Sequence, residues 1–296
     1  MSSEIQEKVY NSLMYFCDCI MPQVTVILPT WNRAKWLKIS IESVLSQTFQ
    51  DFELIVVDDA STDSTVEILE SYYGKIKSIY LPENLGVSAA RNTAIAQSDS
   101  KRIAFLDSDD YWHAEKLEKQ IKQTILRPEH QIHFTDEIWI RNGIRVNPKN
   151  KHRKREGRIF KPSLALCLMA PSTVMLHREL LERHGMFDDS LPVCEDYDLW
   201  LRLTAYHSVA LLNEKLMTRH GGHSDQLSRK LWGIDRFRVQ SLQKILSQEN
   251  LRSEDRIAAI RMLRKNCEIL IKGFRNRGKM NEIRVYQKIA QKYSDI

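Results

Sequence analysis

The chain has 296 residues, enough for two domains of ordinary size or for one large domain with an appendage. Gly and Pro together make up only about 6% of it, half the usual share, which excludes a collagen-like chain, a Gly/Pro-rich disordered chain and a barrel of many short strands. The net charge of +6 is unevenly spread, because residues 229–296 carry 17 Lys or Arg against 7 Asp or Glu, whereas the rest of the chain is slightly acidic.

Residues 1–22 form an N-terminal segment in which Val9, Leu13, Phe16 and Ile20 recur at helical spacing. The segment lacks the basic start and long apolar stretch of a signal peptide, and no apolar run in the chain reaches the roughly 18–20 residues that span a bilayer. The five cysteines are odd in number and scattered, unlike a disulfide framework. We therefore expect an amphipathic N-terminal helix and a cytoplasmic protein with reduced thiols.

From residue 24 onward, short apolar runs alternate with segments of helical periodicity. The expected strands are Val24–Leu28, Glu53–Val57, Ile76–Leu81 and Arg102–Leu106, and the expected helices are Ala34–Ser46, Ser61–Tyr73 and Val87–Gln97. Such a series predicts an α/β fold, a Rossmann-like parallel sheet with helices on both faces. Right-handed crossovers place the carboxyl ends of its strands at one edge, where ligands of such sheets bind.

An acidic cluster, Asp107-Ser108-Asp109-Asp110, follows the fourth predicted strand. Two carboxylates one residue apart are able to present oxygens to one divalent cation, and Mg²⁺ or Mn²⁺ shares such ligands with substrate phosphates. An isolated Asp-x-Asp is more often a pair of loop acids or a helix cap, but its place after an apolar strand favours a metal site. Neither a Gly-x-Gly-x-x-Gly fingerprint nor a P-loop is present, which argues against the usual dinucleotide and nucleoside-triphosphate sites.

A second acidic pair, Asp58 and Asp59, follows the second predicted strand. A carboxylate there is able to accept hydrogen bonds from a nucleotide base or a ribose hydroxyl. The alternative role is capping of the next helix, which is the role we expect of Asp63. Arg91, in the third predicted helix, is long enough to reach a phosphate or the acidic cluster, or it serves as a structural ion-pair partner.

Five motifs in this order resemble the family 2 glycosyltransferases, which have the GT-A fold. They are Pro29-Thr30-x-Asn32-Arg33, Val56-Val57-Asp58-Asp59-Ala60-Ser61-Thr62-Asp63, Asn84-x-Gly86-x-x-x-Ala90-Arg91-Asn92, Asp107-Ser108-Asp109-Asp110 and Glu195-Asp196-Tyr197-Asp198-Leu199-Trp200-Leu201-Arg202. The resemblance covers residues 23–225 and implies inverting transfer of a sugar from a nucleotide-diphosphate donor to an acceptor hydroxyl. The remaining segment, 226–296, is expected to be a basic helical extension.

The resemblance also implies roles for individual residues. The nucleotide pocket would be lined by Pro29, Thr30, Asn32 and Arg33, while Asp58 would contact the base and Asp59 would lie beside the nucleotide. Those packed beneath the nucleotide, holding the acidic site, would be Asn84, Gly86 and Arg91. Those holding the ribose and the metal-bound diphosphate would be Asp107, Ser108 and Asp109, with Asp110 as a secondary acid.

The late acidic motif would supply the catalytic base, Asp196, with Glu195 as a secondary acid. One base suffices for a single in-line displacement, whereas a retaining double displacement also needs a nucleophile. Leu199, Trp200 and Leu203 would then face the core; the alternative for the two acids is charge compensation at a helix start. The resemblance further implies that His220 or His223 lies near the metal.

The acceptor is not identified by any motif. Trp139, Arg141 and Arg145 are candidates for binding a sugar or an anionic group, and the basic run 149–158 is expected to be a solvated loop. Beyond residue 226, two apolar stripes at helical spacing predict helices packed on the body or on a second subunit. Their basic outer faces are either ordinary solvated surface or a site for anionic lipid heads at the inner membrane face.

These observations favour a metal-dependent, inverting glycosyltransferase that uses Mn²⁺ or Mg²⁺ and acts on a glycan, lipid-linked or protein acceptor, alone or as a homo-oligomer. No nucleic-acid partner is expected, since no basic-aromatic recognition motif occurs. Two alternatives remain. A nucleotidyltransferase would carry a Gly-rich, Arg-containing loop where Thr30-Trp31-Asn32-Arg33 stands, and a non-catalytic binding module would not need Asp107, Asp109 and Asp196 together.

Overall fold

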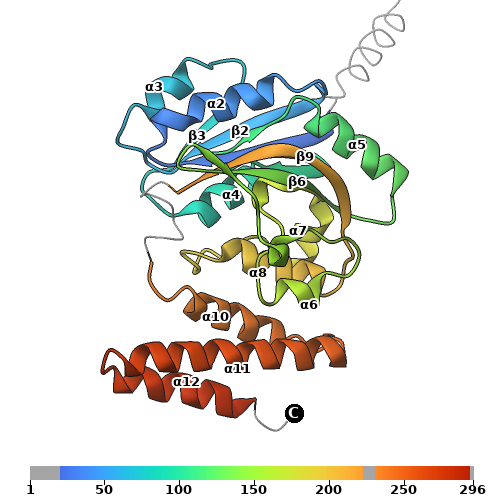
Figure 1. Cartoon of the computed structure of the whole chain (residues 1–296). Helices are drawn as coiled ribbons and strands as arrows, with labels where there is room; N and C mark the ends of the chain where they lie inside the picture. Colours follow the sequence, from blue (N-terminus) through green and yellow to red (C-terminus); the bar gives the residue numbers. More distant parts are fainter. Residues whose placement is uncertain (1–20, 223–230, 294–296) are drawn as a thin grey trace, which may run out of the picture.

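The computed structural model of the chain describes residues 21–222 and 231–293 (Figure 1). The predicted N-terminal helix and His223 lie outside the described residues. Among the helices that are described, none is long and apolar enough to cross a membrane.

One mixed sheet forms the centre of the molecule, with its described strands in the order β3-β2-β1-β4-β8-β6-β9-β5 and β7 paired to β6. Its first half is parallel and contains the four predicted strands, with ends shifted by one or two residues: β1 (Val24–Thr30), β2 (Phe52–Asp58), β3 (Lys77–Tyr80) and β4 (Arg102–Phe105). Pro29 does not end β1, since it pairs with Val57 of β2. Strand β4 pairs with β1 only as far as Ile27, so Pro29 lies where β1 has a neighbour on one side, a position that proline tolerates.

The second half of the sheet corrects the expectation of an all-parallel sheet. Its strands are β5 (Tyr111–Trp112), β6 (Ile132–Arg141), β7 (Ile144–Val146), β8 (Val174–His177) and β9 (Ala210–Gly221). β8 is antiparallel to both β4 and β6, while β6 and β9 are parallel. β9 also carries β5 in antiparallel pairing, and its register against β6 shifts near Asp136. The strict β-α-β repeat therefore stops after β4, which is where the sequence pattern also stops.

Helices cover both faces of the sheet, as predicted. One face is covered by α2 (Ala34–Leu45), α3 (Thr65–Glu70) and α5 (Lys116–Leu126), and the other by α4 (Val87–Ala96), α7 (Arg178–His184) and α8 (Glu195–Thr204). Alternate residues of β1 divide between the two cores, with Val26 on the α2 side and Ile27 on the α4 side. Short helical turns are η1 (Asn150–His152), α6 (Phe160–Ser163) and η2 (Pro171–Thr173).

The C-terminal extension consists of α10 (Asp235–Leu246), α11 (Ser253–Arg275) and α12 (Met280–Lys292), which stack beneath α6 and α8 (Figure 1). Its apolar stripes share one buried cluster with side chains of the body: Phe160 and Leu164 from the α6 region, and Tyr197, Leu201 and Ala205 from the α8 region. The predicted packing of the helices on the body is thus confirmed.

Candidate active site

A cavity of about 460 Å³ opens at the carboxyl ends of β1 and β4. Of the predicted site residues, it is lined by Pro29, Arg33, Arg91, Asp107, Ser108, Asp109, Asp110, Glu195, Asp196 and His220. Thr30, Asn32, Asp58, Asp59, Asn84 and Gly86 are not among its lining residues, although they flank it at the ends of β1 and β2 and in the loop before α4. The fold therefore gathers motifs that lie more than 100 residues apart.

Thr30 and Asp58 are paired at the carboxyl ends of β1 and β2. Both residues are almost completely buried, and one oxygen of Asp58 accepts the backbone N–H of Ser61 at 3.2 Å. The other carboxylate oxygen and the Thr30 hydroxyl have no hydrogen-bond partner among the described residues. Because a buried polar atom without a partner is costly, this pair is suited to hydrogen-bond donors of a ligand.

Asn32 and Asp59 instead hold loops of the protein. The Asn32 side chain accepts the backbone N–H of Thr62 at 2.7 Å, and the backbone N–H of Asn32 donates to the Ser61 hydroxyl at 2.8 Å. The loops after β1 and β2 are joined by these two bonds. The two carboxylate oxygens of Asp59 accept the N–H groups of Leu85 and Gly86 at 2.7 and 2.8 Å. Asp59 thus fixes the loop that leads into α4, rather than presenting free oxygens to a nucleotide.

The remaining parts of these loops are local structure. Gly86 has φ 93°, a left-handed conformation that glycine adopts without a steric penalty, and the amide of Asn84 donates to the Asp59 carbonyl at 3.3 Å. Asp63 accepts the N–H of Thr65 at 3.0 Å just before α3, but the N-cap residue of that helix is Ser64 and not the expected Asp63.

Arg91 joins the two acidic motifs. Its guanidinium donates to Asp107 at 2.7 Å and to Glu195 at 2.8 Å, and it lies 4.9 Å from the centre of the Phe187 ring. The Arg91 side chain is only 3% exposed and Glu195 is nearly buried, whereas Asp107 is 30% exposed. Burial and repulsion from Asp196 raise the pKa of Glu195 to about 7, against the attraction of Arg91. Arg91 therefore fixes the distance between the β4 end and the start of α8.

Asp110 and His220 tie the acidic cluster to β9. The buried Asp110 carboxylate accepts the Ser172 hydroxyl at 2.7 Å and the His220 N–H at 3.0 Å. Burial, followed by repulsion from Asp109 and Asp107, raises the pKa of Asp110 well above its ordinary value. The His220 Nδ1 lies 3.0 Å from the Asp109 carbonyl and must donate to it, which leaves Nε2 as the ring atom able to bind a ligand.

The donor set around Asp109 fits a divalent cation by its chemistry. Mg²⁺ and Mn²⁺ are commonly held by one or two carboxylates together with substrate phosphates, and a histidine ligand usually donates its second ring nitrogen to a carbonyl, as His220 does. Arg91 occupies one oxygen of Asp107. In residues 21–222 and 231–293, no three His, Cys, Asp or Glu side chains form a complete cage, so a cation there would need oxygens from the substrate.

Asp196 lies in the first turn of α8 and lines the cavity, while Leu199, Trp200 and Leu203 face the sheet core, as predicted. Its carboxylate accepts its neighbouring Tyr197 N–H at 2.6 Å and the Cys167 thiol at 3.3 Å. The residue before the helix, Cys194, has φ 65°, an unusual conformation for a residue with a side chain. This sharp turn places the start of α8 beside the cavity.

The comparison with known proteins decides the family. The model of the family described as Glycosyl transferase family 2 matches residues 25–185.

The chain belongs to the family 2 glycosyltransferases.

The sequence relatives of this glycosyltransferase align with different shares of its chain. A putative teichuronic acid biosynthesis glycosyltransferase of Bacillus subtilis, TuaG, is 31% identical over 73% of this chain and 88% of its own length. The Escherichia coli enzyme WfgD, a UDP-Glc:alpha-D-GlcNAc-diphosphoundecaprenol beta-1,3-glucosyltransferase, is 34% identical over 64% of this chain and 73% of its own. An uncharacterized glycosyltransferase of Rickettsia felis is 33% identical, but this chain spans only 32% of it.

Solved structures confirm the GT-A fold. Residues 1–349 of Staphylococcus aureus TarS, solved with UDP-GlcNAc, match with a TM-score of 0.64 at 18% identity, covering 91% of this chain and 92% of that one. The Pyrobaculum calidifontis mannosyltransferase PcManGT, solved with GDP-Man and Mn²⁺, matches with a TM-score of 0.60 at 16% identity, covering 98% and 91%.

Two charged cavity residues of this glycosyltransferase were not predicted from the sequence. Arg219, next to His220 in β9, lines the cavity; enclosure there works to lower its pKa, but attraction to Glu137, Asp110 and other carboxylates outweighs this and raises it. Lys154, expected in a solvated loop, is only 8% exposed and pairs with buried Glu137 at 2.6 Å. Arg219 adjoins a histidine that was noticed, whereas nothing in the basic run distinguishes Lys154 from its neighbours.

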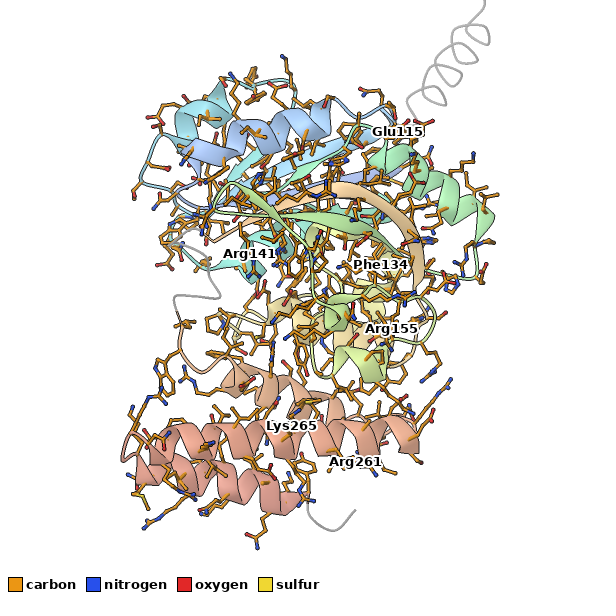
Figure 2. All side chains as sticks on the ribbon, viewed as in Figure 1. Glu115, Phe134, Arg141, Arg155, Arg261 and Lys265 are labelled. Carbon is orange, nitrogen blue, oxygen red and sulfur yellow. The ribbon has the colours of Figure 1, made fainter. Side chains whose placement is uncertain are left out.

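The three acceptor candidates divide. Trp139 and Arg141 line the cavity, and Arg141 lies near the end of β6 (Figure 2). Arg145 is exposed on β7 and is not among the lining residues, because the turn after β6 carries it away from the cavity. The three described cysteines, Cys167, Cys194 and Cys267, are free thiols, as expected.

Proposed function

We propose that this glycosyltransferase moves a sugar from a nucleoside-diphosphate donor to an acceptor hydroxyl on a glycan or lipid-linked precursor, with inversion at the anomeric carbon. The observation that carries the proposal is the Arg91 bridge, which sets the Asp107 cluster and the Asp196 carboxylate in the walls of one cavity. We use "donor end" for the ends of β1, β2 and β4, and "acceptor end" for the start of α8 and the adjoining wall.

At the donor end, the Asp58 oxygen that has no partner among the described residues would accept a hydrogen bond from the nucleoside, and the Thr30 hydroxyl would accept or donate one. Asp109, with either Asp107 or His220 Nε2 and with oxygens of the donor diphosphate, would hold a divalent cation, which when bound supplies positive charge that stabilises the departing diphosphate. Arg219 adds a permanent positive charge to the same cavity. These groups support departure of the nucleoside diphosphate without requiring a covalent sugar intermediate.

At the acceptor end, Asp196 would take the proton of the attacking hydroxyl. Its neighbour Glu195 is committed to Arg91, so Asp196 is the carboxylate of this pair that is not held by an ion pair to Arg91. A single base of this kind suits one in-line displacement, which inverts the anomeric centre.

The donor site is tested by calorimetry with UDP, GDP and dTDP, each with and without Mn²⁺. We expect one nucleotide to bind, and Mn²⁺ to strengthen its binding. TarS and PcManGT were solved with nucleotides of different bases, so the fold is compatible with either. Absence of binding by all three would overturn the donor site, and product mass spectrometry with a panel of sugar nucleotides then identifies the sugar transferred.

We also propose peripheral contact with an anionic membrane through the basic outer face of the extension. Exposed cations on α11 and α12 are Arg261, Arg264, Lys265, Lys272, Arg275, Arg284, Lys288 and Lys292. Among them, Arg261 and Lys265 lie on α11 (Figure 2). The lipid-linked acceptor in the name of WfgD supports this placement, because such an acceptor resides in a membrane.

A further inference from the structure

The helical extension supplies part of the cavity wall. Ile234, immediately before α10, and Arg238, in the first turns of α10, line the same cavity as Asp196. Helix α10 is fixed there because it packs against α8, and its buried Val239 and Leu242 belong to the cluster that contains Tyr197. The extension is therefore part of the site and not only an appendage of the body.

Arg238 adjoins the acceptor end. Its guanidinium lies 5.7 Å from the centre of the Tyr197 ring, and its charge opposes the rise in the pKa of Cys194, which burial brings to about 12. These two residues flank the pair Glu195 and Asp196 in the sequence, so Arg238 lies beside the proposed base.

Part of the hydrogen-bonding capacity of Arg238 is available to a ligand. Among the residues described, Arg238 pairs with Asp235 one turn away at 3.3 Å and hydrogen-bonds the Cys194 side chain, while its buried Nε has no hydrogen-bond partner there. The two ion pairs of Arg91 are shorter, at 2.7 and 2.8 Å. A planar guanidinium with available donors is suited to bind phosphate oxygens in a forked geometry.

An exposed aromatic residue, Trp232, lies in the chain shortly before α10. Trp232 is 46% exposed, and three cations lie over its ring, with Arg236, Arg277 and Lys279 at 4.4, 5.4 and 5.3 Å from its centre. An apolar ring surrounded by cations is suited to the boundary between phosphate groups and hydrocarbon. Trp232 precedes the cavity-lining Ile234 by two residues and is not itself among the residues that line the cavity.

We propose that Arg238 binds a phosphate group of the acceptor, and that the acceptor is a phosphate-linked lipid whose apolar part passes over Trp232. This inference rests on the proposed function, and it names the acceptor class and a residue that selects it. Arg238 would hold the acceptor phosphate while the hydroxyl of the attached sugar reaches Asp196. It is a specificity-determining residue, and it takes no part in the transfer of the proton.

The test is calorimetry with farnesyl diphosphate, at saturating nucleoside diphosphate and Mn²⁺ so that the donor site is filled. We expect Arg238→Gln to weaken binding about tenfold or more, because a charge-assisted hydrogen bond is lost, and Arg238→Lys to restore part of it. The matched control is Arg252→Gln, which removes the same charge from an exposed position of the extension that does not line the cavity and should leave binding unchanged.

Two further probes separate lipid from phosphate. The binding of inorganic pyrophosphate should be weakened by Arg238→Gln, and in the wild type it should be weaker than that of farnesyl diphosphate. The binding of farnesol should be unchanged by Arg238→Gln. Equal binding of farnesyl diphosphate by the wild type and Arg238→Gln, equal losses in both Gln variants, or no binding by the wild type would overturn the inference. Failure of every nucleotide to bind would instead overturn the proposed donor site, and is measured separately.

Discussion

The donor and acceptor ends of the cavity differ in how their polar side chains are used. At the donor end, both carboxylate oxygens of Asp59 accept backbone N–H groups, and Asp110 accepts the Ser172 hydroxyl and the backbone N–H of His220. Arg91 there is held by ion pairs to two carboxylates. At the acceptor end, Asp196 has a thiol and its own helix as partners, and among the described residues Arg238 pairs with Asp235 at 3.3 Å and hydrogen-bonds Cys194.

This difference indicates two physical strategies within one site. The donor end is a preorganised frame, in which buried charges fix one another and little rearrangement is needed when a substrate arrives. The proposed acceptor end instead contains Asp196, which has no ion pair to Arg91, and the partly exposed Arg238. Changes at the two ends should consequently have different signatures, with catalysis lost at one and folding stability lost at the other.

The largest effect is expected from Asp196→Asn. The amide retains the shape of the carboxylate but cannot accept the proton, so we expect the rate of transfer to fall by about 10²–10⁴-fold while nucleotide binding persists. Steady-state transfer and calorimetry on the same preparation provide the two readouts. Transfer that continues at near the wild-type rate would exclude Asp196 as the base.

Arg91→Met should act mainly on stability. Removing the buried guanidinium leaves the nearly buried carboxylate of Glu195 without its counter-charge, and the partly exposed Asp107 also loses its partner, so we expect a loss of about 3–5 kcal/mol in the free energy of unfolding. Urea denaturation measures it. The control is Arg127→Met, which breaks the exposed pair with Glu156 and should cost at most about 1 kcal/mol. Similar losses in the two variants would mean that the Arg91 bridge is not a strong structural link.

The contrast between the two ends also explains what the sequence could predict. The first four strands and their helices follow from local apolar patterns, and the Asp-x-Asp cluster follows from its place after an apolar strand. The antiparallel strand β8 was not predicted, because its four residues carry no periodic signal and its partners, β4 and β6, are distant in sequence.

The uses of individual side chains were harder to predict. Whether Asp59 faces a nucleotide or a loop depends on the path of the backbone at Gly86, which a motif does not specify. Lys154 and Arg238 reach the cavity because of long-range packing, one against Glu137 and the other through α10 on α8. Surface charges in a basic run or on an amphipathic helix look alike until that packing is known.

Glu195→Gln should remove a pH dependence of stability. Since burial raises the pKa of Glu195 to about 7 from its ordinary 4.5, the folded protein binds more protons than the unfolded chain between these values, and this carboxyl lowers stability as pH rises from about 4.5 to 7. A shift of this size corresponds to about 3 kcal/mol. We expect the free energy of unfolding, measured with urea at about pH 5 and about pH 7.5, to differ less between the two pH values in Glu195→Gln than in the wild type. The exposed control Glu70→Gln should keep the wild-type difference; an unchanged difference in Glu195→Gln would contradict the assignment.

The smallest effect is expected at the outer face of the extension, far from the cavity. The double change Arg261→Gln with Lys265→Gln should weaken flotation with phosphatidylglycerol vesicles about tenfold at low salt, because each cation near an anionic surface contributes about 1 kcal/mol. The control removes two exposed cations of the body, with Lys151→Gln and Arg153→Gln. Equal loss in both pairs would assign the attraction to net charge, whereas loss in the α11 pair alone, diminishing as salt is raised, assigns it to this face. The latter result would place the outer face of α11 at the membrane, where a lipid-linked acceptor resides.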